Sequence, residues 1–234
     1  MKLNNSHWLL SRPIAHRGLW NENIPENTLL AYQNAIENGF PIEIDLHRSL
    51  DGEIFVFHDD DLSRLTGVKG KIYEKTKSEI KSLTINGTKE KIPTLSETLE
   101  FVNGRVPLLI EIKLQPNSKI VLDVVKILKM YKGEFAVQSF NPAYIIKIKK
   151  LAPEFTRGVL ASKAKFKNKL HGFIVNKMPL NFIAKPHFIS FRHTDLPIKR
   201  KPPIICWTIT STKQWKACSP YAKNIIFENF IPKK

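Results

Sequence analysis

Apolar and charged positions alternate in two short segments of the N-terminal half of the chain. Residues 42–46 read Ile-Glu-Ile-Asp-Leu, so an extended chain places three apolar side chains on one face and Glu43 and Asp45 on the other. The segment Leu-Leu-Ile-Glu-Ile-Lys, which ends at Lys113, likewise places Glu111 and Lys113 together, opposite three apolar side chains. Both segments predict strands that are covered on one face and carry charge on the other.

Similar apolar runs, rich in β-branched residues, alternate with longer helical patterns along the rest of the chain. Strands are expected at 13–17, 42–46, 107–113, 135–140, 156–160, 187–192, 204–210 and 225–228. Helices are expected at 28–38, 118–131, 142–151 and 212–217, the first with Asn27 as N-cap and Gly39 as C-cap. Eight strand–helix units in a chain of 234 residues predict an α/β fold, the TIM (β/α)8 barrel.

The connection after the second strand is too long for a bare barrel. An Asp51-Gly52 hairpin turn leads into an apolar run at 54–57, and the next barrel strand begins only at 107. We therefore expect an insertion at residues 51–104 between strands 2 and 3, with helices near 77–83 and 96–102. The whole chain, residues 1–234, is expected to form a single catalytic barrel domain.

Chemically active residue types stand at the ends of the expected strands. His16 and Arg17 end the first strand, and His58 follows the hairpin strand. An acid on the inner face of a buried strand is costly unless it is paired or binds a metal, and in barrels the carboxyl ends of strands carry catalytic residues. Together with the acids of strands 2 and 3, this set suits a divalent cation and acid–base work on a phosphate ester. Gln138 and Trp207 fit either barrel filling or a substrate rim.

The charge of +16 is concentrated in the second half of the chain. Residues 1–117 hold 14 Lys and Arg against 16 Asp and Glu, whereas residues 118–234 hold 23 against 5. A basic surface attracts phosphate esters, nucleic acid or anionic lipid, but lysine-rich helix faces are also common as mere solvated surface. No apolar stretch is long enough to span a membrane, no signal-peptide core precedes residue 12, and only two cysteines occur, so we expect a cytoplasmic protein.

An ordered series of motifs adds to this interpretation. It comprises His16-Arg17-Gly18, Pro25-Glu26-Asn27-Thr28, Glu43-x-Asp45, Asp51-Gly52, His58-Asp59, Leu62-x-Arg64-x-Thr66, Ile92-Pro93-Thr94-Leu95 and Glu111-x-Lys113. In this order and spacing the chain resembles the glycerophosphodiester phosphodiesterase family. The match is dense from Ala15 to Lys113 and thinner afterwards, where Gln138-Ser139-Phe140-Asn141 and Trp207-Thr208 resemble later strand motifs.

The resemblance implies a TIM barrel with an insertion after strand 2 and one divalent cation, Mg²⁺ or Ca²⁺. It implies that Glu43, Asp45 and Glu111 hold the cation, that His16 and His58 act as general acid and base, and that Arg17 and Lys113 contact the phosphate. The chain departs from the family pattern at Ser49-Leu50, at Leu65 and at Ile226-Phe227-Glu228-Asn229, outside this set.

The function expected is therefore metal-dependent hydrolysis of glycerophosphodiesters to sn-glycerol 3-phosphate and an alcohol. The main alternative is a phospholipase D-like enzyme acting on lysophospholipids, and a rival of another class is a non-catalytic basic barrel that binds anions or membranes. We expect a small phosphodiester substrate and an anionic membrane surface as partners and no specific nucleic acid.

Overall fold

The computed structural model describes residues 3–85, 87–163, 180–198 and 202–232. The chain divides into two compact units. The N-terminal unit is Ile14–Phe135, and the C-terminal unit combines Met1–Pro13 with Ala136–Lys234. Every residue of the acidic and cationic set predicted above lies in the N-terminal unit.

Parallel strands form the centre of the N-terminal unit, with β2 (Ile42–Arg48) between β1 (Ile14–His16) and β4 (Leu108–Ile112). The register pairs His16 with Glu43 and Asp45 with Glu111. Because paired residues of neighbouring strands point to the same face of a sheet, this register brings the predicted acids together.

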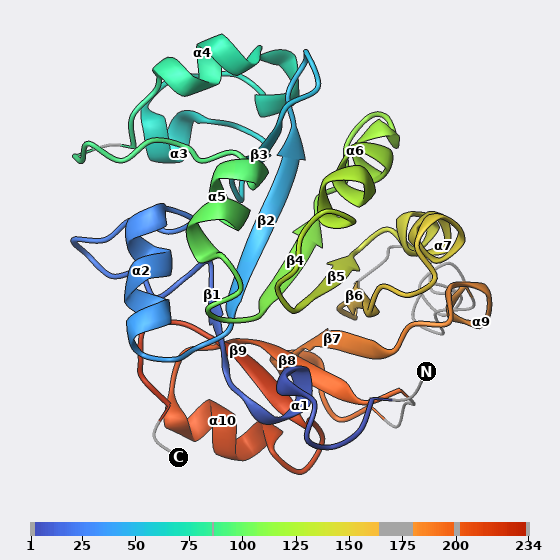
Figure 1. Cartoon of the computed structure of the whole chain (residues 1–234). Helices are drawn as coiled ribbons and strands as arrows, with labels where there is room; N and C mark the ends of the chain where they lie inside the picture. The colour runs from blue at the N-terminus through green and yellow to red at the C-terminus, as the bar shows by residue number, and fades with distance from the viewer. Residues whose placement is uncertain (1–2, 86, 164–179, 199–201, 233–234) are drawn as a thin grey trace. The chain divides into compact units, whose positions relative to one another are not determined.

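Three helices of the N-terminal unit follow or precede these strands, as Figure 1 shows: α2 (Leu29–Glu37), α5 (Leu95–Val102) and α6 (Lys119–Leu128). The prediction that Asn27 is the N-cap of α2 is wrong. The cap is Thr28, whose Oγ1 accepts a hydrogen bond from the backbone N–H of Ala31 at 3.2 Å. Asn27 instead has a positive φ of 54° and uses its side chain elsewhere. The C-cap is Asn38, so the prediction of Gly39 as C-cap is one residue off. Gly39 follows the cap with a φ of 70°, the left-handed conformation that glycine adopts without strain.

The insertion folds around apolar side chains of its own. It begins with β3 (Ile54–Val56), which pairs antiparallel with β2, and continues through α3 (Ser63–Thr66), η1 (Ile72–Glu74) and α4 (Lys77–Ser82) to α5. A cluster of buried residues joins these elements: Phe55, Phe57, Leu62, Ile72, Ile80 and Ile92. Burial of these side chains gives the insertion a fixed shape and so fixes the loop that carries His58.

The C-terminal unit continues the alternation of parallel strands and helices. Its strands lie in the order β5 (Phe135–Ser139), β6 (Arg157–Ala161), β7 (Phe188–Arg192), β8 (Ile204–Ile209) and β9 (Asn224–Phe227). Among its described residues, the helical segments are α1 (Trp8–Ser11), α7 (Pro142–Leu151), α9 (Asn181–Ala184), η2 (His193–Asp195) and α10 (Thr212–Cys218). All eight barrel strands expected from the sequence are therefore present. In the described part of the chain, no helix is long and apolar enough to cross a bilayer.

Candidate active site

Three buried carboxylates from β2 and β4 meet on one face of the sheet. Glu43, Asp45 and Glu111 expose 2%, 1% and 6% of their surface, and one oxygen of each lies within 4.8 Å of the others. Asp45 and Glu111 are register partners, and Glu43 precedes Asp45 by two residues on the same face. The three acids therefore lie on one face of the sheet, as the alternation along residues 42–46 and 108–113 predicts.

Two cations lie against the three acids. Lys113 Nζ is 2.8 Å from Asp45 Oδ1 and 2.9 Å from Glu111 Oε1. Arg17 Nε lies 3.6 Å from Asp45 Oδ2, and the Arg17 backbone N–H donates to Glu43 Oε2 at 3.3 Å. The predicted anion-binding residues therefore already contact the carboxylate cluster.

The two cations do not balance the three carboxyl groups. Burial raises the pKa of Glu43 well above its ordinary value, and the charges of Asp45 and Glu111 add to the rise. Burial also raises the pKa of Glu111 to about 7, against the opposing charge of Lys113. Burial acts to raise the pKa of Asp45 as well, but Lys113 and other nearby cations outweigh it and hold that pKa below its usual range.

The donor set suits a hard divalent cation, because it offers converging carboxylate oxygens in a buried place with a deficit of positive charge. Glu43, Asp45 and Glu111 are the residues that would hold it. Their oxygens are close enough to one another for all three carboxylates to coordinate a single cation.

The two candidate histidines have acidic neighbours. His16 Nε2 lies 4.0 Å from Glu43 Oε2. His58 Nδ1 lies 2.6 Å from Asp59 Oδ1, which fixes the plane of the His58 ring and directs Nε2 to the other side. Burial lowers the pKa of His58, while Asp45 and the hydrogen bond to Asp59 act against that change.

His47 lies on the same face of β2 as the acids, but its contacts support the loop that carries His58. Its Nε2 is 3.3 Å from the backbone carbonyl of His58, and its Nδ1 is 3.4 Å from Gln115 Nε2. Burial lowers the pKa of His47 to about 4, so the ring is neutral at pH 7 and supports the loop that carries His58.

Sequence reasoning missed the side chains that hold Asp45 from the loop before α2. Asn27 Nδ2 donates to Asp45 Oδ2 at 3.0 Å, and the fully buried Tyr32 donates its hydroxyl hydrogen to Asn27 Oδ1 at 3.1 Å. The motif Pro-Glu-Asn-Thr marked this loop, but its partner lies 18 residues further along the chain, where no periodic pattern indicates it.

A second missed contact joins the insertion to the same loop. Arg64, on α3, donates to Glu26 Oε1 at 2.7 Å and to Glu26 Oε2 at 3.0 Å, and its Nε donates to Asp59 Oδ2. Glu26 Oε1 also accepts from Arg17 NH1 at 2.6 Å. Arg64 therefore lies between the partner of Arg17 and the partner of His58.

The two residues predicted for a substrate rim lie in the C-terminal unit. Gln138 on β5 is buried, and its Oε1 accepts a 2.6 Å hydrogen bond from Ser190 Oγ. The Trp207 ring on β8 packs edge-on against Phe140, with 5.6 Å between ring centroids. These contacts fit packing within that unit, and the role of both residues in a substrate rim stays a prediction.

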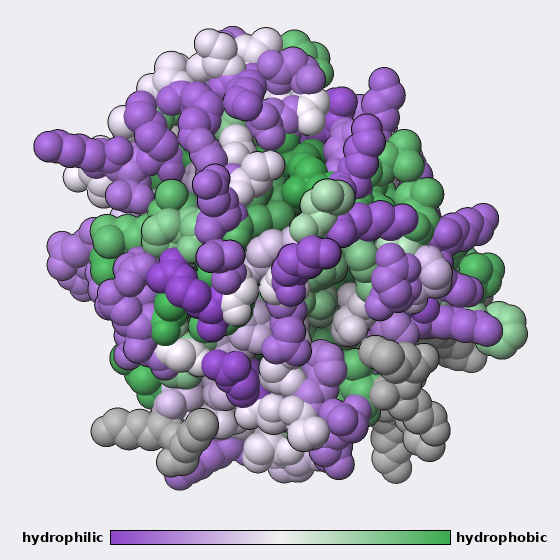
Figure 2. All heavy atoms as spheres, viewed as in Figure 1, coloured by the Kyte–Doolittle hydropathy of each residue, from purple (hydrophilic) through white to green (hydrophobic). Residues whose placement is uncertain are grey.

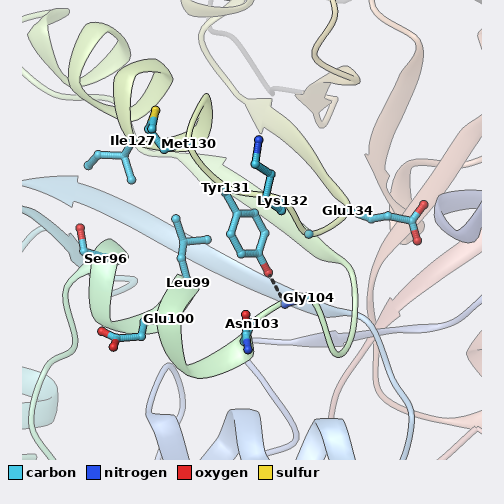
Figure 3. A pocket seen from close by; sticks show the side chains of 11 residues that line it. Ser96, Leu99, Glu100, Asn103, Gly104, Ile127, Met130, Tyr131, Lys132 and Glu134 are labelled. Carbon is cyan, nitrogen blue, oxygen red and sulfur yellow. Dashed lines mark hydrogen bonds between the residues drawn. The ribbon is translucent and has the colours of Figure 1, made fainter.

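The N-terminal unit also has an open cavity of about 540 Å³, whose lining residues Figure 3 shows. Its walls come from the end of α5, the end of α6 and the segments that enter β4 and β5, and the Tyr131 hydroxyl accepts a hydrogen bond from the Gly104 N–H at 3.0 Å. The cavity therefore lies before the first residues of β4, whereas Glu111 stands near its last, and the two sites share no residue.

Comparison with known proteins decides the family. The model of the glycerophosphoryl diester phosphodiesterase family matches residues 16–231. The chain belongs to this family. The matched span begins at His16 and includes every residue of the carboxylate cluster and its cations.

Relatives of the chain in this family come from bacteria and mammals. A glycerophosphodiester phosphodiesterase of Caldanaerobacter subterraneus is 36% identical over 162 residues, which are 63% of this chain and 65% of the relative. A lysophospholipase D of Rattus norvegicus is 33% identical over 138 residues, 53% of this chain and 43% of the relative. The chain thus spans less than two thirds of the length of these two curated relatives.

Solved structures with a similar fold support the fold assignment of this chain. A phosphodiesterase of Oleispira antarctica, solved with its product sn-glycerol 3-phosphate, matches with a TM-score of 0.77 at 24% identity over 92% of each chain. The chain has the TIM-barrel fold of this structural family, with parallel strands and helices between them. The fold predicted from the sequence is confirmed.

Proposed function

We propose that the chain is a metal-dependent phosphodiesterase that hydrolyses glycerophosphodiesters to sn-glycerol 3-phosphate and an alcohol. The observation that carries this proposal is the buried cluster of Glu43, Asp45 and Glu111, with Lys113 and Arg17 against it. A non-catalytic barrel gains nothing from three buried acids, because each carries a desolvation cost. The name of the Caldanaerobacter relative supports the same reaction.

The cation proposed is Mg²⁺ or Ca²⁺, held by Glu43, Asp45 and Glu111, since both ions prefer oxygen ligands. When bound, it neutralises charge that builds up on the phosphate oxygens. Arg17 and Lys113 are placed to bind the same oxygens, because both cations border the carboxylate cluster.

The proton transfers are assigned to the two histidines. Bond formation between an oxygen nucleophile and phosphorus releases one proton, and cleavage of the bond from phosphorus to the alcohol oxygen requires one. His16 and His58 take these two roles, and Asp59 keeps His58 in the orientation that presents Nε2. One molecule of water is consumed for each diester cleaved.

The nucleophile is either a neighbouring hydroxyl of the substrate or water. In the described structure His58 pairs with an aspartate, and the cysteines Cys206 and Cys218 lie buried in the C-terminal unit. A hydroxyl of the glycerol group gains a large effective concentration from being part of the substrate, and the cyclic phosphate that it forms is then opened by water.

The test is product analysis with glycerophosphocholine and with an analogue that lacks the hydroxyl next to the ester carbon. We expect release of sn-glycerol 3-phosphate and choline from the first, far faster than cleavage of the second. Equal kcat/KM values for both would assign the attack to water and leave the phosphodiesterase proposal standing. No cleavage of either substrate with Mg²⁺ or Ca²⁺ present would contradict the proposal itself.

A second candidate is a lysophospholipase D, and a surface of the C-terminal unit favours it. Leu180, Phe182 and Ile183, at and before α9, are 41%, 85% and 50% exposed. Helix α9 packs against α7, and Lys149 Nζ donates to the backbone carbonyl of Ile183 at 2.8 Å. Figure 2 shows apolar and hydrophilic side chains next to one another over α7 and α9.

Exposed apolar side chains beside lysines fit an anionic bilayer, since the apolar groups enter the interface and the ammonium groups meet lipid phosphates. The rat relative is named for activity on lysophospholipids. Sedimentation with vesicles containing phosphatidylserine tests the surface, with Phe182→Ser expected to weaken binding and Leu122→Ser, an exposed leucine of α6, as its control. Faster cleavage of soluble than of micellar substrate, with no vesicle binding, would exclude this candidate. The cytoplasmic location stays a prediction, which cell fractionation tests.

A further inference from the structure

Five side chains form one continuous series of ion pairs in the N-terminal unit. It runs from Arg17 to Glu26, from Glu26 to Arg64, from Arg64 to Asp59 and from Asp59 to His58. Its two ends are the arginine proposed to bind phosphate and a histidine proposed to transfer a proton. Its centre, Arg64, belongs to the insertion and touches neither the carboxylate cluster nor either end residue in any described contact.

All three guanidinium nitrogens of Arg64 are used. NH1 and NH2 hold the two oxygens of Glu26 in a bidentate pair, and Nε holds Asp59. The planar guanidinium of arginine can bind one carboxylate through two parallel N–H bonds and a second one in a fixed direction. The ammonium of lysine can also pair with two carboxylates, but it is a point charge without this bidentate geometry. Glu26 and Asp59 come from different loops and lie 33 positions apart in sequence, so Arg64 sets their separation.

These ion pairs include partly buried carboxylates and change their pKa values. Glu26 is 6% exposed, and Arg64 and Arg17 outweigh its burial and lower its pKa. Asp59 also has a lowered pKa, because Arg64 and His58 outweigh its partial burial. Both carboxylates are therefore charged acceptors at neutral pH, each fixed between two partners.

We propose that Arg64 is a positioning residue, which holds Arg17 through Glu26 and His58 through Asp59 at the separation that one substrate phosphate requires. This inference rests on the proposed phosphodiesterase function. In this proposal the insertion has a role in the site, because its helix α3 places Arg64 beside the loops that carry Glu26 and Asp59. Arg64 itself contacts no reacting atom, so its effects reach the reaction through Glu26 and Asp59.

The imidazole of His58 gives a readout that needs no activity. The charged groups that act on it are Asp45 from β2, Lys113 after β4, Arg17 after β1 and Asp59 beside it. Asp59 raises the pKa of His58 through its hydrogen bond, so its loss lowers that pKa. If Arg64 holds Asp59 in place, Arg64→Met lowers the pKa of His58 in the same direction as Asp59→Asn. If Arg64 acts only as a nearby positive charge, Arg64→Met raises it.

The experiment is an NMR titration of the His58 ring in the full chain, with its resonance assigned by His58→Gln. We expect a downward pKa shift in Arg64→Met, a similar one in Asp59→Asn, and no further shift in the double variant. Lys81→Met removes an ion pair of the same insertion, between Lys81 and Glu97 at 2.8 Å, and is the control expected to leave His58 unchanged. An unchanged or raised His58 pKa in Arg64→Met would overturn the proposal.

Steady-state kinetics distinguish the two halves of the series, the Glu26–Arg17 pair and the Asp59–His58 pair. Glu26→Gln is expected mainly to raise KM through Arg17, Asp59→Asn mainly to lower kcat through His58, and Arg64→Met to do both, with a loss of about 10–100-fold in kcat/KM. Arg64→Lys, which keeps the charge without the fork, should recover only part of that loss. Full recovery by lysine would contradict the positioning role. An inactive wild-type chain would contradict the proposed function, while the His58 titration would still decide the role of Arg64.

Discussion

At the residue scale, Glu43 carries an electrostatic cost in the folded chain. Burial and the charges of Asp45 and Glu111 raise its pKa, so its ionised form destabilises the folded chain when no cation is bound. The unfolded chain releases the Glu43 proton near its ordinary pKa, so the cost is present at pH 7 and disappears as the pH falls below that value. Glu43→Gln removes the charge and keeps the shape of the side chain.

Glu43→Gln should therefore raise the midpoint of thermal unfolding at pH 7 in EDTA, and the gain should shrink toward pH 4. Circular dichroism at both pH values measures the difference. Glu100→Gln, an exposed glutamate of α5, is the matched control and should change neither midpoint. A lower midpoint for Glu43→Gln at pH 7 would show that Lys113 and Arg17 already compensate the charge.

The two histidines should each matter to turnover. His16→Ala and His58→Ala are expected to lower kcat by roughly 10²–10⁴-fold, the usual contribution of general acid–base catalysis. The measurement is kcat with glycerophosphocholine over a pH series, which should be bell-shaped for the wild type and lose one limb in each variant. Near wild-type turnover in His58→Ala would move the second proton transfer to another residue.

Much of the site could be predicted from residue patterns, and its supporting contacts could not. The alternation in β2 and β4 located Glu43, Asp45, Glu111 and Lys113 because side-chain direction in a strand follows sequence position. The contact from Asn27 to Asp45 comes from a loop, where no periodicity relates position to direction. The Arg64–Glu26 pair spans 38 positions and depends on how the insertion packs.

At the element scale, helix caps show where local sequence suffices and where it does not. Thr94 caps α5 with a reciprocal pair of bonds: its Oγ1 accepts from the Glu97 N–H at 3.2 Å, and its own N–H donates to Glu97 Oε2 at 2.8 Å. At α2, Asn27 and Thr28 are both good capping residues, and the expected choice failed because Asp45 binds the Asn27 side chain.

Thr94→Ala should lower the free energy of unfolding by about 1 kcal/mol, the usual cost of losing an N-cap hydroxyl. Urea unfolding measures the change, and Thr94→Ser, which keeps the hydroxyl, should lose much less. Equal losses in both variants would show that the threonine methyl group, not the cap, supplies the stability.

At the scale of the whole molecule, the eight strands expected from the sequence are all present, but their grouping into two compact units was not predicted. Strand prediction uses local patterns, whereas the division into units depends on contacts between distant segments, such as the bonds from Asn224 to the carbonyls of Leu9 and Arg12 at 3.0 and 2.6 Å. That the chain unfolds as one domain stays a proposal.

Tryptophan positions make that proposal testable. Trp8, Trp207 and Trp215 belong to the C-terminal unit, whereas Trp20 belongs to the N-terminal unit together with the proposed cation ligands. The variant Trp20→Phe therefore keeps tryptophans in the C-terminal unit alone. If the chain is one cooperative domain, Mg²⁺ or Ca²⁺ at about 100 times its Kd should stabilise it by about 2.7 kcal/mol and raise the fluorescence midpoint as well. Asp45→Asn should abolish the rise. In Trp20→Phe, a rise seen by circular dichroism but not by tryptophan fluorescence would indicate two independent domains.

Metal dependence is tested by the rate of glycerophosphocholine hydrolysis before chelation, in excess EDTA, and after Mg²⁺ or Ca²⁺ is restored. We expect release of sn-glycerol 3-phosphate that EDTA abolishes and one of the two cations restores. Asp45→Asn should stay inactive throughout, because it removes charge from the proposed ligand set. Full turnover in excess EDTA, or full activity of Asp45→Asn, would contradict a metal-dependent phosphodiesterase centred on Glu43, Asp45 and Glu111.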